Sequence, residues 1–120
     1  TTQFTDTNVF AEAALLDETL KRTLKLPEVF ICANDFIAID LIRALRRQGV
    51  RVPEDIFITG FDNSAESRII EPHLTTIDIP SSKMGYIAAD LLLSRIREPE
   101  TPYRIMYVRT NAKYRESAMI

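Results

Sequence analysis

The stretch PEVFICANDFIAIDLIRALRRQGVRVPEDIFITGFDNS, residues 27–64, carries the clearest fold signal of the chain. Residues 28–33 are a short apolar run, which is typical of a strand buried on both faces of a sheet. A helix is predicted over residues 35–48, because apolar residues recur at i, i+3, i+4 and i+7. The predicted core stripe of this helix consists of Ala38, Leu41, Ile42 and Leu45. Gly49 suits the end of the helix, and residues 55–61 form a second apolar strand, so the stretch predicts a parallel βαβ unit.

The rest of the chain continues this alternation. Residues 6–25 have helical spacing, residues 74–79 are predicted to form a third strand that ends at Pro80, and residues 103–109 a last one. Between the last two strands, residues 81–97 form a helix with one apolar face. That face comprises Met84, Ile87, Ala88, Leu91, Leu92 and Ile96. The predicted fold class is α/β, a Rossmann-like lobe built on a parallel sheet.

Length and composition limit the class of protein. The 120 residues suit one domain, and 46% hydrophobic with 27% charged residues is a globular composition. The net charge of −2 argues against a module that by itself binds nucleic acid. No apolar run approaches the ~18 residues of a membrane span, so no membrane partner is expected. The chain begins at Thr1 without an initiator Met, and we expect it to be a fragment of a longer protein.

Two polar residues directly follow predicted strands. Asn34 follows the first strand and Asp62 follows the second, and ligands of open parallel sheets bind beyond the carboxyl ends of the strands. A carboxylate and an amide together suit the neighbouring hydroxyls of a polyol. Each residue also has a local interpretation. Asn34 can cap the helix that follows it, and Asp62 can form an Asx-turn with Asn63 and Ser64.

The sequence disfavours an enzyme. Cys32 lies inside an apolar strand, where burial keeps a thiol protonated, and His73 lies in a turn-rich loop. One His and one Cys make a metal site of these ligands unexpected, and no glycine-rich phosphate loop or nucleophile elbow occurs. We therefore expect no catalytic residues, no metal and no cofactor.

The helix over residues 35–48 has two further features. Phe36 and Ile39 lie off its core stripe, which suggests a partner surface, unless another part of the chain covers them. Arg43, Arg46 and Arg47 form a basic ridge near its end. The ridge suits a solvated complement to the helix dipole better than a phosphate contact.

As an ordered set, these motifs resemble the lactose-repressor (LacI/GalR) family of bacterial transcription regulators. The set is AND at 33–35, GVRVPEDI at 49–56, GFDN at 60–63, PHLTTIDIP at 72–80, MG at 84–85 and RES at 115–117. The resemblance implies a cytoplasmic homodimer that binds operator DNA through a headpiece absent from this chain. It also implies a two-lobed core, similar to type I periplasmic binding proteins, that closes around a small effector, often a sugar. Residues 1–79 would belong to the C-terminal lobe, and residues 80–120 would be a crossover helix and strands returning to the other lobe.

The resemblance also implies roles for individual residues. Asn34 and Asp62 fall on effector-contacting positions, and Phe4 falls near an aromatic that stacks on the effector. Dimer contacts fall on Ile39 and Ile70, beside the exposed position expected for Phe36.

Two positions depart from the family pattern. Ile79 stands where many sugar-binding members have Gln, which puts a standard sugar pose in doubt, and Asp40 replaces a common Gly. A periplasmic or surface sugar-binding protein of the same fold is the alternative function, and a small α/β enzyme is a third, without a motif in its support.

Overall fold

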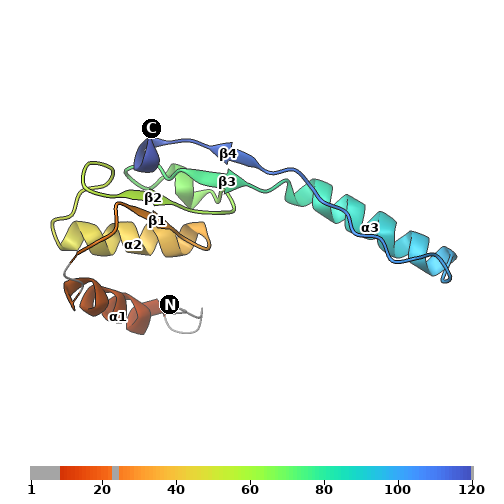
Figure 1. The fold of residues 1–120 in the computed structure, drawn as a ribbon, viewed down its shortest axis with the longest axis horizontal. Helices are drawn as coiled ribbons and strands as arrows, with labels where there is room; N and C mark the ends of the chain where they lie inside the picture. Colours follow the sequence, from red (N-terminus) through yellow and green to blue (C-terminus); the bar gives the residue numbers. More distant parts are fainter. Residues whose placement is uncertain (1–8, 23–24, 120) are drawn as a thin grey trace.

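The computed structural model describes the backbone of residues 9–22 and 25–119, and the side chains from Leu15 onward within these ranges. Helices and short strands alternate along the chain (Figure 1). The elements are α1 (Val9–Arg22), β1 (Val29–Ile31), α2 (Asp35–Arg47), β2 (Phe57–Thr59), η1 (Glu66–Arg68), β3 (Thr76–Asp78), α3 (Ser81–Arg97), β4 (Asn111–Lys113) and η2 (Glu116–Ala118). The predicted order of elements is confirmed up to α3.

The strands form two two-stranded sheets, β1 with β2 and β3 with β4, which isolated bridges connect. β1 and β2 pair in parallel, with Phe30 opposite Ile58, as the βαβ prediction requires. Isolated parallel bridges, Thr59 to Thr75 and Asp62 to Asp78, join β2 to the β3 side. β4 then pairs antiparallel with β3, so the strand pairing is not wholly parallel.

The core lies between α2 and one face of the sheet. The stripe predicted for α2 is buried, and Ile42 and Leu45 have exposed fractions of 1% and 0%. Ile58 from β2 and Leu74 before β3 complete this core and are fully buried. Apolar burial of this kind contributes about 1.5–3 kcal/mol for each large side chain, so this contact dominates the stability of the lobe.

Both flanks of α2 are covered as well. On one side α1 packs against it, and Arg47 binds the Asp17 carboxylate at 2.9 Å. On the other side Arg46 donates to the carbonyl oxygen of Glu71, in the segment that follows η1. Arg46 and Arg47 of the predicted basic ridge therefore bind other segments of the same chain.

The two residues off the core stripe of α2 differ in exposure. For Ile39 the structure favours the alternative that another part of the chain covers it, because only 4% of it is exposed. It lies seven residues before Arg46, on the same side of the helix, where the segment after η1 lies against α2. Phe36 is exposed, as predicted, and Ile70 is half-buried against the core.

The outer face of β1 is uncovered, contrary to the prediction of a strand buried on both faces. Val29 and Ile31, which alternate with Phe30, are 45% and 86% exposed. Within residues 9–22 and 25–119, α2 and α1 lie on the same side of β1 (Figure 1). The described residues therefore cover only one face of β1, although its apolar sequence suits burial on both.

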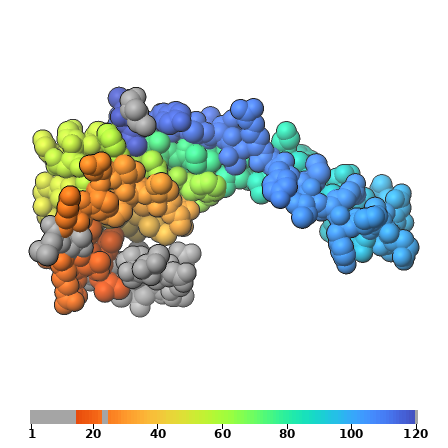
Figure 2. Space-filling view, in the orientation of Figure 1, coloured from red at the N-terminus to blue at the C-terminus, as the bar shows by residue number. Residues whose placement is uncertain are grey.

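α3 and the segment that follows it form a projecting arm (Figure 2). α3 has no buried residue, so its predicted apolar face is open, with Met84, Leu92 and Ile96 exposed. Residues 103–109, predicted as a strand, instead run beside α3, where the Arg95 guanidinium lies 4.6 Å from the Tyr103 ring centre. The last strand begins only at Asn111, because only there does the chain reach β3. None of the described helices has the length and apolar character needed to cross a membrane.

We predict that Gly60→Ala destabilises the lobe. A Cβ at this position would overlap the Asp35 carboxylate and lie 2.8 Å from Cδ2 of Leu74. Overpacking of this kind costs about 1–3 kcal/mol. Urea unfolding should show this loss. Gly85→Ala is the matched control, because within residues 9–22 and 25–119 no atom outside its own stretch of helix lies within 4 Å of the Cβ position. Equal unfolding midpoints for the two variants would contradict this packing.

Candidate functional site

A buried carboxylate organises the junction between the loop after β2, the start of β3 and the N-terminus of α2. Asp35, the first residue of α2, is completely buried. Its two oxygens accept hydrogen bonds from the backbone N–H of Ser64 at 2.7 Å and from the hydroxyl of Thr76 at 2.5 Å. Its own N–H donates to the carbonyl oxygen of Phe61 at 2.9 Å. Asp35 therefore fastens the loop after β2 and the start of β3 to the N-terminus of α2.

Asn34 has the local role that its sequence suggested as one option. It is the N-cap of α2, and its Oδ1 accepts from the backbone N–H of Ile37 at 2.9 Å. The Nδ2 group has no hydrogen-bond partner within the part of the chain that the structure describes. Capping fixes the side chain and leaves this donor available to a ligand.

Asp62 differs from its neighbours because its carboxylate has no hydrogen bond or ion pair among the described residues. The residue is exposed, and its backbone N–H donates to the carbonyl oxygen of Ile77 at 2.9 Å. The Asx-turn interpretation is wrong, since the N–H of Ser64 is bound by Asp35. Asp62 also has a φ of 107°, a conformation that costs a residue with a side chain about 1–3 kcal/mol and is common at binding sites.

A second polar chain, which sequence reasoning missed, holds the next residue. Asn63 has a φ of 53°, and its Nδ2 donates to Asp78 at 2.9 Å. This hydrogen bond is the main reason that the pKa of Asp78 lies below its usual value, and Lys113 at 3.6 Å adds to the effect. On its other side, Oδ1 of Asn63 accepts from Arg115 at 2.6 Å. Arg115 is the first residue of the RES motif, which entered the sequence analysis only as part of the family resemblance. No local sequence pattern predicts its contact with Asn63.

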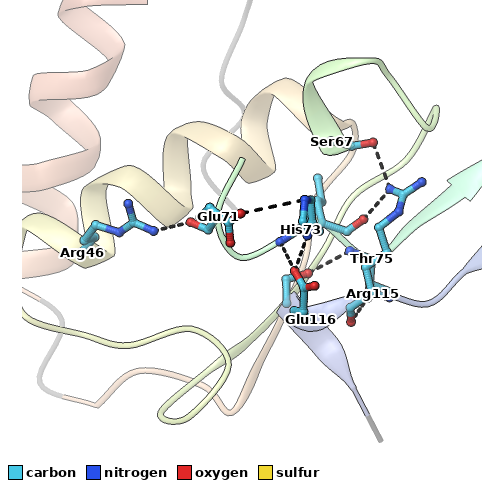
Figure 3. Close-up of polar contacts among 9 residues, drawn as sticks. Arg46, Ser67, Glu71, His73, Thr75, Arg115 and Glu116 are labelled. Atoms are coloured by element: carbon cyan, nitrogen blue, oxygen red, sulfur yellow. Dashed lines mark hydrogen bonds and ion pairs between the residues drawn. The ribbon is translucent and has the colours of Figure 1, made fainter. Parts of the chain in front are cut away.

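A third cluster joins the turn before β3 to the C-terminal segment (Figure 3). The backbone N–H and the ring Nδ1 of His73 both lie 2.6 Å from Oε2 of Glu116. Glu71 lies on the other side of the ring, with Oε1 3.9 Å from Nε2. These three residues form a group that could hold a metal ion. Since Glu116 Oε2 already has two partners from His73, the structure explains the cluster as a fastening of η2, and we assign no metal to it.

Cys32, Phe4 and one hollow of the structure remain to be considered. Cys32 is buried, and burial raises the pKa of its thiol to about 11, which agrees with an inert cysteine. Phe4 lies outside the described residues. A hollow between α3 and the segment that follows it is lined mainly by Leu91, Arg95, Pro102 and Tyr103, and includes neither Asn34 nor Asp62.

We predict an acid-dependent contribution of Glu116 to stability. The hydrogen bond from the His73 backbone lowers the pKa of Glu116 below its ordinary 4.5. A lowered carboxyl pKa stabilises the fold fully above the ordinary value, and this stabilisation is lost as the pH falls through the lowered pKa. Glu116→Gln should therefore unfold at lower urea than the parent chain at neutral pH, and the gap should close as the pH falls below the ordinary 4.5 and through the lowered pKa of Glu116. Glu54→Gln, at an exposed position, is the control, and a gap that persists in acid would contradict the assignment.

Comparison with known proteins gives this geometry a context. The family of the periplasmic binding protein-like domain matches residues 1–118. The ribose operon repressor of Haemophilus influenzae is 35% identical over 91 residues, which are 76% of this chain and 27% of the repressor. The probable HTH-type transcriptional repressor ExuR of Bacillus subtilis is 37% identical over 103 residues, 83% of this chain and 31% of the repressor. The chain thus spans less than a third of the length of these two relatives.

Solved structures agree with these relatives. The transcriptional regulator CelR in complex with cellobiose superposes with a TM-score of 0.79 and 32% identity, over 88% of this chain and 32% of that one. A LacI family transcriptional regulator from Enterococcus faecium with bound ribose gives a TM-score of 0.72 and 31% identity, over 88% and 38%. The α/β lobe found here is therefore the periplasmic-binding-protein-like fold of these regulators. The chain belongs to the periplasmic binding protein-like domain family and, within it, to the LacI-type transcriptional regulators.

Proposed function

We propose that the chain is the effector-binding and dimerisation portion of a LacI-type DNA-binding transcriptional regulator. One observation carries the proposal. The exposed carboxylate of Asp62, held at a positive φ beyond the end of β2, has no partner among the described residues. The Nδ2 donor of Asn34, which precedes α2 at the end of β1, is similarly unused. A charged acceptor and an amide donor at one sheet edge suit the hydroxyls of a carbohydrate.

The relatives support a sugar as the effector and a regulator as the class. The similar structures named above hold cellobiose and ribose, and the relatives named above are repressors. These names favour the regulator over a periplasmic or surface sugar-binding protein. In this proposal Phe4 stacks on the sugar, and binding requires no cofactor and no catalysis. Ile79 offers no side-chain hydrogen bond, so the pose relies on Asp62 and Asn34.

The uncovered surfaces support a larger, two-lobed protein. Residues 1–79 form part of the C-terminal lobe, and residues 80–120 return toward the other lobe, which covers the apolar face of α3. Effector binding closes the lobes and shifts a cytoplasmic homodimer between two states with different affinity for operator DNA. The headpiece that contacts DNA lies outside this chain.

We predict that Asp62→Asn weakens sugar binding by about 10- to 100-fold, because a hydrogen bond to a charged group contributes about 1.5–3 kcal/mol. Asn suits this position because it tolerates a positive φ, so the backbone is preserved. Calorimetric titration of the two-lobed protein with ribose and cellobiose measures the effect. Glu66→Gln, at an exposed position of η1, is the control. Unchanged affinity in Asp62→Asn would overturn the site, and binding of neither sugar by the parent protein would overturn these two effectors.

The proposed dimer surface includes Phe36, which is 59% exposed, and Ile70, whose neighbour Ile69 is 74% exposed. Ile39 is buried, so it would contribute to this surface only through packing. We predict that Phe36→Glu raises the dissociation constant of the dimer at least about tenfold, since burial of such a side chain contributes about 1.5–3 kcal/mol. Sedimentation velocity over a concentration series measures this change. Tyr114→Glu, on an exposed aromatic outside the proposed surface, is the control, and equal dimerisation of both variants would contradict the assignment.

A further inference from the structure

The backbone at Asp62 and Asn63 needs an external restraint. Two consecutive residues with side chains have positive φ values, 107° and 53°. Such conformations persist only where the surrounding structure over-determines them. The N–H of Asp62 is fixed by Ile77 and that of Ser64 by Asp35, but these bonds lie on either side of Asn63.

The side chain of Asn63 supplies the missing restraint. Its amide is held from both ends, because Oδ1 accepts from Arg115 at 2.6 Å and Nδ2 donates to Asp78 at 2.9 Å. A cationic donor on one side and a carboxylate on the other fix the orientation of the amide, since a flipped amide would lose both bonds. The backbone N–H of Asn63 adds only a long contact to the Thr76 hydroxyl, at 3.3 Å.

Arg115 is itself anchored in the body of the lobe. Its Nη1 donates to the carbonyl oxygen of Leu74 at 2.7 Å and to the hydroxyl of Ser67 at 3.0 Å. Its backbone N–H donates to the hydroxyl of Thr75 at 2.8 Å. Figure 3 shows the guanidinium reaching from the C-terminal segment toward Ser67. Two nitrogens of the planar guanidinium share these bonds, since Nη1 binds Leu74 and Ser67 and Nη2 binds Asn63, and the single nitrogen of a lysine does not offer this geometry.

We infer that Arg115 is a positioning residue of the effector site. Acting through Asn63, it holds the left-handed turn at residues 62–63 and so fixes the direction of the Asp62 carboxylate. The C-terminal segment thus restrains a site located 53 residues earlier in the chain. The effect of Arg115 on effector binding rests on the proposed function. The restraint of the turn can be tested without any ligand.

The first experiment measures hydrogen exchange by mass spectrometry in the two-lobed protein. Arg115→Met keeps the aliphatic stem and removes the donors. We expect exchange of the amides of Asp62–Ser64 to accelerate by on the order of tenfold, since their local opening no longer breaks the Arg115–Asn63 bond. Amides in the middle of α2 should keep the parent rate. Arg109→Met, the same change at an exposed position of the same segment, is the control. Parent-like exchange at residues 62–64 in Arg115→Met, or equal acceleration throughout the lobe, would overturn the inference.

The second experiment is a double-mutant cycle on affinity, with ribose and cellobiose as probes. Arg115→Met should weaken binding about tenfold in the parent background and have little further effect in the Asp62→Asn background, because both changes disable one carboxylate. Equal losses in both backgrounds would show that Arg115 acts elsewhere. If Asp62→Asn alone leaves affinity unchanged, the proposed site fails. The exchange experiment then still decides whether Arg115 restrains the turn.

Discussion

The buried carboxylate of Asp35 is the constraint on which this lobe depends. Burying a polar side chain without hydrogen-bond partners is costly, and Asp35 is completely buried, so the fold depends on its hydrogen bonds from Ser64 and Thr76. This requirement determines the residues around it. Gly60 is needed because a side chain there would overlap the carboxylate. The stretches around Asp35, Gly60–Ser64 and Thr76 are far apart in sequence and meet at the Asp35 side chain. Their contacts fix the loop after β2 and the start of β3 against α2.

Hydrogen bonds within the chain also determine which polar groups remain available to a ligand. Asp35, Asn63, Asp78 and Arg115 all have their hydrogen bonds within the chain. The Asp62 carboxylate and the Nδ2 of Asn34 remain without partners in the described residues. A polar site made in this way is rigid before it binds, since the groups that orient it do not have to rearrange. Preorganisation reduces the ordering cost of association.

Much of this organisation was predictable from the sequence, and the failures have a common physical cause. The apolar spacing of α2 and the order β1–α2–β2 follow from local periodicity, and Asn34 and Asp62 follow from their places after strands. The burial of Ile39 was left open because local spacing cannot show whether a segment about 30 residues later packs against α2. The strand at 103–109 was misplaced because pairing depends on where the chain returns to β3. Arg115 was missed because its contacts with Asn63 and Leu74 span 52 and 41 residues, beyond any local pattern.

The stability of the arm must come from outside the described residues. An isolated helix of about 15 residues is marginal in water, and most helical stability in proteins comes from packing. α3 has 17 residues, no buried side chain and no side-chain cap at Pro80. Its contacts with the segment after it, through Arg95, Tyr103 and Arg104, lie near its C-terminal end. The exposed apolar face of α3 is therefore what is expected of a helix that packs against another layer. This face and the exposed side chains of β1 would each need a covering layer. The second lobe proposed above would cover α3 and so would lie on the α3 side of the effector site.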